Sequence, residues 1–384
     1  MLRRFEVKNF KNFNDWFIFD LSDTKSYEFN PECVESGIVA KALIYGPNGC
    51  GKTNLGHAIF DIKTHLTDDK IDDTYSNNYL NAALGADLAE FKYTFLFGDN
   101  KLEYAYGKKS VNKLVYETVM INGKEVVSLD RRKGSVARID LTGAETLKTD
   151  LGDSDLSVVK YVKSNAALEN TSTTNTFFLF NLFIEYMMIE RTINSHNKIS
   201  VNSLNVSDFI LDPDSMLEGL SGLESFEAFL IEAGIKCKLT TLETNGTQRI
   251  AFAFGDEKID FCSIASTGTL SLTELYIQLM LLRIKLKRAP RFDTNLRPFI
   301  FIDEFDAFYH HAISKLIVKS LRDYKCQAVL TTHNTSIMSN DLLRPDCYFI
   351  MSETDIKPMY RFTEKELRKA HNIEKMYKAG AFDG

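Results

Sequence analysis

The spacing of apolar and polar positions predicts a hairpin at the N-terminus, followed by a buried strand and a helix. Residues 2–7 alternate between apolar and polar side chains, and residues 16–19 supply a second short apolar run. Alternation with a period of two is typical of half-buried strands. Residues 42–45 are apolar throughout, as in a strand covered on both faces, and residues 54–65 continue as a helix.

The middle of the chain predicts first an antiparallel layer and then a helical insertion. Residues 91–97 and 102–106 alternate around a Gly-Asp-Asn turn, and residues 115–127 are interrupted by Asn-Gly. Such turns between alternating runs favour β-hairpins. From residue 151 to 233 the pattern becomes helical, without sustained heptads, so no long coiled-coil arm is expected.

The C-terminal part predicts strands that complete a parallel sheet. Two strand-like runs, 236–242 and 248–254, precede a helix over 272–286. Short, fully apolar runs then follow, of the sort that fill a sheet covered on both faces: 299–302, 328–331 and 347–351. The predicted class is α/β, with a mixed or parallel sheet, an antiparallel β layer and a helical insertion.

The strongest chemical signal is a complete phosphate-binding loop between the strand at 42–45 and the following helix. The fixed positions of the P-loop are all present. Backbone N–H groups of such a loop surround a phosphate, the lysine reaches the β- and γ-phosphates, and the hydroxyl ligates Mg²⁺. The residues expected to bind nucleotide are Gly46, Pro47, Asn48, Gly49, Cys50, Gly51, Lys52, Thr53 and Asn54.

Two carboxylates follow the apolar run at 299–302. Asp303 at the strand tip is expected to hold Mg²⁺ together with Thr53, and Glu304 is expected to polarise the attacking water. An apolar run that ends in two acids is common, but a P-loop upstream favours the functional interpretation, because phosphoryl transfer needs a metal ligand opposite the loop.

Two further features are weaker when taken alone. His333 follows the apolar run at 328–331, where its imidazole could reach the γ-phosphate; a lone histidine is more often a core or surface residue. Ser266 and Gly268 lie in a small-polar turn that opens a helix, and such a turn presents N–H groups to an anion. An ordinary helix cap is the alternative for this turn.

Taken in this order, the motifs resemble the ATP-binding-cassette class of ATPases in its SMC-like branch. The resemblance covers residues 1–62 and 261–351, with support from the tail 371–380. It implies a P-loop NTPase head of the ABC type. Its N-terminal lobe would span residues 1–150, the helical insertion 151–235, and the C-terminal lobe 236–384 with the signature, Walker B acids and switch histidine.

The resemblance also implies the roles of the site residues. ATP and Mg²⁺ would be the cofactors, Lys52, Glu304 and His333 the catalytic residues, and Thr53 and Asp303 the metal ligands. Ser266 and Gly268 would contact the γ-phosphate on a second copy of the chain, so that a head-to-tail homodimer or higher homo-oligomer sandwiches ATP. The N-terminal turn with Lys11 and Asn12 resembles the turn that touches nucleotide in SMC-like heads. No glutamine is assigned to the Q-loop.

Differences from the usual ABC-class motifs point to one group within the class. The signature reads Ser-Thr-Gly-Thr rather than Ser-Gly-Gly-Gln, and residues 303–310 resemble the corresponding stretch of stand-alone bacterial AAA-type ATP-binding proteins. The OLD, PARIS and Septu defence ATPases are relatives of that group. The resemblance therefore implies a nucleotide-driven switch or sensor in anti-phage defence, with a separate nuclease or toxin as effector.

Composition and charge limit the other functions that the chain could have. The chain has 384 residues and a net charge of −6, so it exerts no bulk attraction on nucleic acid. Basic runs at 131–133 and 283–288 leave open a repair or recombination ATPase that clamps DNA; solvated faces are the alternative interpretation of these runs. The six scattered cysteines and the absence of a signal-like N-terminus suit the cytoplasm and no membrane association. The nucleotide-binding subunit of a membrane transporter is a further alternative, disfavoured by the altered signature.

Overall fold

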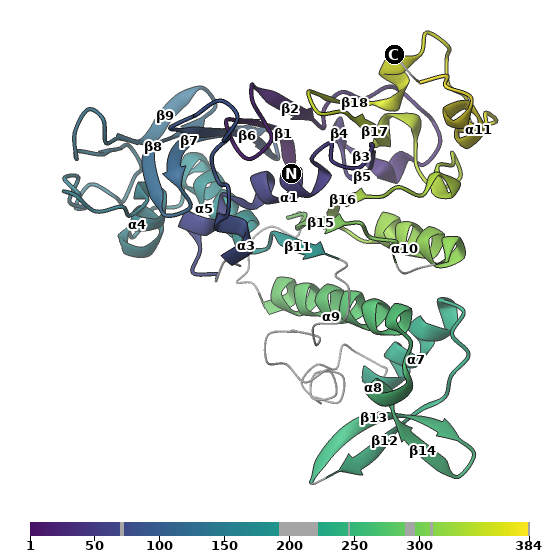
Figure 1. Cartoon of the computed structure of the whole chain (residues 1–384). Coiled ribbons are helices and arrows are strands. Elements are labelled where there is room, and N and C mark those ends of the chain that lie inside the picture. The colour runs from purple at the N-terminus through teal and green to yellow at the C-terminus, as the bar shows by residue number, and fades with distance from the viewer. Residues whose placement is uncertain (70–72, 192–221, 245, 289–295, 308–309, 383–384) are drawn as a thin grey trace. The chain divides into compact units, whose positions relative to one another are not determined.

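The computed structural model describes residues 1–69, 73–191, 222–244, 246–288, 296–307 and 310–382 (Figure 1). The chain forms two compact units. The first comprises residues 1–189, 294–305 and 319–384, and the second comprises residues 190–293 and 306–318. The first unit contains the P-loop, and the second contains the predicted signature turn.

A six-stranded mixed sheet forms the centre of the first unit. Its strand order is β11-β15-β16-β5-β17-β18, with parallel pairing from β15 through β16 and β5 to β17 and an antiparallel β18 (Figure 1). The bounds are β5 Lys41–Tyr45, β11 Met188–Arg191, β15 Phe299–Asp303, β16 Gln327–Thr331, β17 Tyr348–Met351 and β18 Ile356–Pro358. The three apolar C-terminal runs are thus confirmed as strands. The helical prediction over 151–233 is wrong at β11, and β18 has no clear sequence signal.

A seven-stranded antiparallel sheet forms the second layer of this unit, in the order β10-β9-β8-β7-β6-β1-β2. The predicted hairpins are confirmed, because β1 pairs with β2, β6 with β7, and β8 with β9, all antiparallel. The bounds are β1 Leu2–Lys8, β2 Phe17–Asp20, β6 Ala89–Phe97, β7 Asn100–Ser110, β8 Lys113–Ile121, β9 Lys124–Asp130 and β10 Arg138–Ile139.

The P-loop helix α1 (Lys52–Phe60) approaches strand β15 closely. A Cβ atom built on Gly56 would lie only 2.5 Å from Cε1 of the Phe301 ring. Glycine at this position therefore lets the helix backbone approach the strand that ends at Asp303. The predicted helix over 54–65 is in fact two pieces, α1 and α2 (Lys63–Leu66), separated at Asp61 and Ile62.

The break after α1 coincides with a buried polar cluster around Asp61. Its carboxylate accepts hydrogen bonds from the hydroxyls of Tyr75, Tyr79 and Tyr106 and pairs with Lys108, with Nζ 3.1 Å from Oδ1. Both side chains of the ion pair are fully buried. Because an unpaired buried charge is costly, this cluster fixes the end of the P-loop helix against the antiparallel sheet.

A histidine lies beside this cluster. His65 Nε2 is 2.7 Å from the Tyr104 hydroxyl, which itself donates to Glu117 Oε2. This contact suits a neutral ring, because each nitrogen of a neutral imidazole either donates or accepts one hydrogen bond. Burial lowers the pKa of His65 well below its usual value, so the ring is neutral at physiological pH.

The first helices of the predicted insertion belong to the first unit. Helix α5 (Ser172–Glu185) contacts β6 and β7, and α4 (Val158–Asn165) contacts β9. A capping box formed by Thr171 and Thr174 starts α5. Residues 192–221 of the predicted insertion lie outside the described residues, and the division into two lobes and an insertion remains a prediction.

The second unit is a small α+β body. Its three-stranded antiparallel sheet, β12-β13-β14, packs with α7, α8 and α9 around a core that includes Phe226, Phe252 and Phe261. The sequence predicts β12, β13 and α9 but not β14. The bounds are α7 Gly222–Glu232, β12 Leu239–Thr244, β13 Thr247–Phe254, β14 Glu257–Asp260, α8 Phe261–Ile264 and α9 Thr267–Arg288.

Short elements complete the described chain: β3 Val34–Glu35, β4 Ile38–Val39, α3 Asp73–Ser76, α10 His311–Asp323 and α11 Ile373–Lys378, with 3₁₀ turns η1 Pro31–Cys33, η3 Thr335–Ile337, η4 Pro345–Cys347 and η5 Met359–Phe362. The unit boundary falls within β11 and α10.

Candidate functional site

The predicted nucleotide-binding residues of the first unit meet at one edge of the mixed sheet. Strands β15, β16 and β5 are adjacent and parallel, so their carboxyl ends share an edge. The P-loop follows β5, Asp303 ends β15, and His333 lies two residues beyond the end of β16. In open α/β sheets, ligands bind outside the carboxyl ends of the strands.

The P-loop has the backbone geometry that its glycines allow. Gly51 precedes α1 with φ of 103°, and a Cβ there would lie 2.5 Å from Nδ2 of Asn12. A Cβ on Gly46 would lie 2.5 Å from the carbonyl oxygen of Met351 in β17. Side chains at either position would displace the neighbouring segments, so the loop remains narrow because both residues are glycine.

Lys52 is held inside this loop. Its Nζ donates to the carbonyl oxygens of Gly46, at 2.8 Å, and Pro47, at 3.0 Å. Burial lowers the pKa of Lys52, while negative charge on Cys50, Asp303 and Glu304 acts in the opposite direction. The side chain is therefore held inside the loop by two backbone carbonyl oxygens.

Asp303 connects the P-loop helix with strand β16. Its Oδ2 accepts a hydrogen bond from the Thr53 hydroxyl at 2.7 Å, and its Oδ1 accepts one from the Thr331 hydroxyl, also at 2.7 Å. The exposed fraction of Asp303 is 2%. Thr53 and Asp303 thus present hard oxygen donors side by side, which is the donor type that Mg²⁺ prefers.

Glu304 and His333 are exposed at the same edge of the sheet. Glu304 has a left-handed backbone with φ of 47°, which turns the chain out of β15 directly after Asp303. Its backbone N–H donates to the Thr331 hydroxyl at 2.7 Å. Thr331 is a residue of the candidate site that the sequence analysis did not predict. Only its position directly before Thr332 and His333 could have marked it in the sequence.

The N-terminal turn touches the P-loop through Asn12 but not through the side chain of Lys11. Asn12 Oδ1 accepts a hydrogen bond from Asn54 Nδ2 at 2.7 Å, beside Gly51. The Lys11 ammonium instead donates to the carbonyl oxygens of Tyr75 and Asn77. Nucleotide contact by Lys11 therefore remains a prediction. To make it, the ammonium would have to give up its hydrogen bonds to these two carbonyl oxygens.

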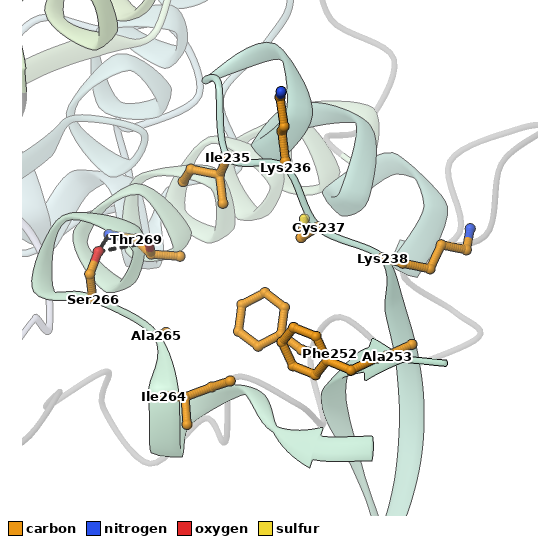
Figure 2. A pocket seen from close by; sticks show the side chains of 11 residues that line it. Ile235, Lys236, Cys237, Lys238, Phe252, Ala253, Ile264, Ala265, Ser266 and Thr269 are labelled. Carbon is orange, nitrogen blue, oxygen red and sulfur yellow. Dashed lines mark hydrogen bonds between the residues drawn. The ribbon is translucent and has the colours of Figure 1, made fainter. Parts of the chain in front are cut away.

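Ser266 and Gly268 lie in the second unit, at the start of α9. The Ser266 hydroxyl accepts from the backbone N–H of Thr269 at 3.2 Å, so it caps the helix, as the alternative interpretation expects. Ser266 and Thr269 also line a pocket of about 580 Å³ (Figure 2). Phe252 and Ile264 contribute apolar surface to this pocket, and Lys236 and Lys238 lie at its margin.

The first basic run makes contacts within the protein. Arg131 donates to the carbonyl oxygens of Ser154 and Leu156, and Arg132 pairs with Asp130 at 2.8 Å. These contacts favour the interpretation of this run as a structural and solvated surface. Residues 283–288 lie in α9, but their side chains are outside those described. Within the described part of the chain, no helix combines the length and apolar character needed to cross a bilayer.

Comparison with known proteins finds a family match for part of the C-terminal half of the chain. Residues 247–339 match the family described as "AAA domain, putative AbiEii toxin, Type IV TA system". This span includes the predicted signature turn, Asp303, Glu304 and His333, but not the P-loop. A search of curated proteins found no match.

Solved structures of SMC heads are similar over most of their length. The SMC head domain from Thermotoga maritima is 17% identical, with a TM-score of 0.43, and the similarity covers 93% of this chain and 98% of that one. An SMC head bound to the C-winged helix domain of ScpA is 15% identical, with a TM-score of 0.45, and the similarity covers 92% of this chain and 96% of that one.

Proposed function

We propose that this chain binds ATP with Mg²⁺ and hydrolyses it. The main support for this proposal is the hydrogen-bonded arrangement of Thr53, Asp303 and Thr331 beside Lys52. It lies at the carboxyl edge of three parallel strands. P-loop NTPases combine a P-loop lysine, a hydroxyl and a Walker B acid in this way. The match of residues 247–339 to an AAA-type domain supports the same chemistry.

Each residue has a distinct task in the proposed reaction. Lys52 and the loop N–H groups would bind the β- and γ-phosphates, and Thr53 with Asp303 would hold Mg²⁺, whose charge would offset that of the phosphate oxygens. Glu304 accepts a proton from the attacking water. His333 contacts the γ-phosphate. Both Glu304 and His333 are exposed, so a second surface is required to exclude water from the reaction.

The hydrolysis is tested by phosphate release from Mg·ATP with the wild type, Lys52→Ala and Glu304→Gln. We expect Lys52→Ala to lose nucleotide binding, and Glu304→Gln to bind ATP normally while its turnover falls about 10²-fold or more. Lys113→Ala, in the exposed pair with Asp155, is the matched control and should behave as wild type. Turnover by Glu304→Gln at the wild-type rate would remove Glu304 from the mechanism.

We propose further that two copies of the chain close over ATP. Ser266 and Gly268 of one copy would contact the γ-phosphate bound by the P-loop of the other. The exposure of Glu304 and His333 supports this arrangement, because the second copy would supply the missing cover. ATP then acts as a dimerisation switch, and hydrolysis resets it.

The biological setting that we propose is bacterial anti-phage defence in the cytoplasm, with a separate nuclease or toxin as effector. The matched family description names a toxin of a toxin–antitoxin system, which supports such a setting. All six cysteines are free, as in a reducing compartment. Phage plating on cells that express the gene with its neighbours, compared with the Lys52→Ala variant, tests this role; equal plating would contradict it.

A further inference from the structure

Thr331 occupies an unusual position between the two acids of the site. Its side chain is fully buried at the end of β16. The hydroxyl donates to Oδ1 of Asp303 and accepts from the backbone N–H of Glu304, both at 2.7 Å. The Thr331 carbonyl also accepts from the N–H of Phe305 at 3.1 Å. One residue of β16 thus holds three consecutive residues at the end of β15.

These contacts determine the orientation of the Asp303 carboxylate. Thr53 donates to one carboxylate oxygen and Thr331 donates to the other. With both oxygens occupied, the carboxylate is held in one rotamer, with Oδ2 directed toward the P-loop hydroxyl. Hydrogen bonds of this kind orient metal-binding carboxylates and tune their affinity.

The same hydroxyl stabilises the backbone of Glu304. A left-handed conformation is unfavourable for a residue with a side chain, and it persists only where the surroundings enforce it. The hydrogen bond from the Glu304 N–H to Thr331 satisfies a donor that the turn would otherwise leave without a partner in the β15–β16 ladder. The direction of the Glu304 side chain therefore depends on Thr331.

We infer that Thr331 is a positioning residue of the ATPase site, which sets the affinity for Mg²⁺ through Asp303 and the rate of hydrolysis through Glu304. This inference rests on the proposed function. Thr331 would act only through the two acidic residues that it hydrogen-bonds, Asp303 through its carboxylate and Glu304 through its backbone N–H. It is distinct from His333, which lies two residues further along and is exposed.

The test compares Thr331→Val, Thr331→Cys and Thr331→Ser with the wild type. Valine keeps the shape and removes the hydroxyl, cysteine is a weak donor, and serine restores the hydroxyl. Hydrolysis is measured against Mg²⁺ concentration at saturating ATP. We expect Thr331→Val to raise the half-saturating Mg²⁺ concentration and lower kcat, each about 10- to 100-fold, with Thr331→Cys between valine and wild type. Thr331→Ser should stay within about threefold of the wild type.

Thr176→Val is the matched control. Thr176 is a buried threonine of α5 whose hydroxyl donates to the Ser172 carbonyl oxygen at 2.8 Å, away from the site. This variant should retain the wild-type Mg²⁺ dependence. A folded Thr331→Val with wild-type kcat and Mg²⁺ dependence overturns the inference, as does a loss that Thr331→Ser fails to restore. If Thr331→Val does not fold, a Thr331→Cys variant with wild-type Mg²⁺ dependence overturns it.

The inference and the proposed function fail in distinguishable ways. Binding of a fluorescent ATP analogue, followed against Mg²⁺ concentration, does not require turnover. If the wild type binds the analogue but never hydrolyses ATP, the proposed hydrolysis is wrong. If wild type and Thr331→Val then show the same Mg²⁺ dependence of binding, the role of Thr331 is wrong as well; a shifted dependence supports it.

Discussion

Substitution of Gly56 by alanine tests whether the P-loop helix depends on close contact with β15. The new Cβ would lie 2.5 Å from Cε1 of Phe301, whereas carbon atoms in favourable contact lie about 3.5–4.0 Å apart. The helix or the ring must therefore move by about 1 Å. Such overpacking costs about 1–3 kcal/mol, and alanine regains about 1 kcal/mol of helix propensity, so we expect a net loss of about 0–2 kcal/mol.

A double-mutant cycle with Phe301→Leu separates the cost of overpacking from the gain in helix propensity. Leucine lacks the ring atoms that meet the new Cβ, so the strain of Gly56→Ala should disappear in the double variant. Phe301→Leu alone should cost about 1–2 kcal/mol, because the ring is fully buried. The double variant should be more stable than the sum of the single variants by about 1–3 kcal/mol.

The assay is urea unfolding followed by tryptophan fluorescence. Trp16 is the single tryptophan and belongs to the first unit, so its signal reports the unit that contains both substitutions. Effects that add within about 0.5 kcal/mol would refute the close contact. Because α1 also carries Thr53, Gly56→Ala should in addition weaken Mg·ATP binding, and Phe301→Leu should restore part of the loss.

Further predictions concern the buried groups that hold α1 in place. Burial depresses the pKa of His65 below its unfolded value of about 6.5, so its contribution to stability is complete above that pH and is lost as the pH falls. Unfolding between pH 8 and 5.5 should show a slope of up to about 1.4 kcal/mol per pH unit from this group. The slope should be absent in His65→Gln, whose amide does not titrate and can still hydrogen-bond to Tyr104. Equal slopes in the two proteins would contradict the depressed pKa of His65. Lys108→Met should cost about 3–5 kcal/mol because it leaves the Asp61 charge buried, whereas Lys113→Met in an exposed pair should cost less than about 1 kcal/mol; equal costs would contradict the buried pair.

Local patterns predicted much of the fold and of the site. The P-loop, the hairpins and the short apolar strands each depend on neighbouring residues, so the sequence specifies them directly. The adjacency of β15, β16 and β5 then brings Lys52, Asp303 and His333 to one edge.

Features that depend on contacts between distant segments could not be predicted in this way. Thr331 contacts Asp303 because β15 and β16 pair in one parallel register, with Ile302 opposite Leu330. Gly56 resembles any helical glycine until Phe301 is placed against it. Likewise, no local signal marks Asp61 and Lys108 as a buried ion pair.

The most direct test of the central claim is whether ATP joins two copies of the chain through the turn at Ser266 and Gly268. Glu304→Gln, which should bind ATP without hydrolysing it, is examined by sedimentation velocity with and without Mg·ATP. Gly268→Glu is added to place a negative charge where the γ-phosphate would bind. An acid in the first turn of α9 favours the helix, so folding should be preserved. Gln248→Glu, on an exposed position of β13, is the control with the same added charge.

We expect Glu304→Gln to form a dimer only with Mg·ATP, and Gln248→Glu in that background to dimerise equally well. Glu304→Gln with Gly268→Glu should remain a monomer that still binds a fluorescent ATP analogue, because its own P-loop is intact. An ATP-dependent dimer in the presence of Gly268→Glu, or full hydrolysis by a wild-type monomer, would contradict the claim that two copies complete the site.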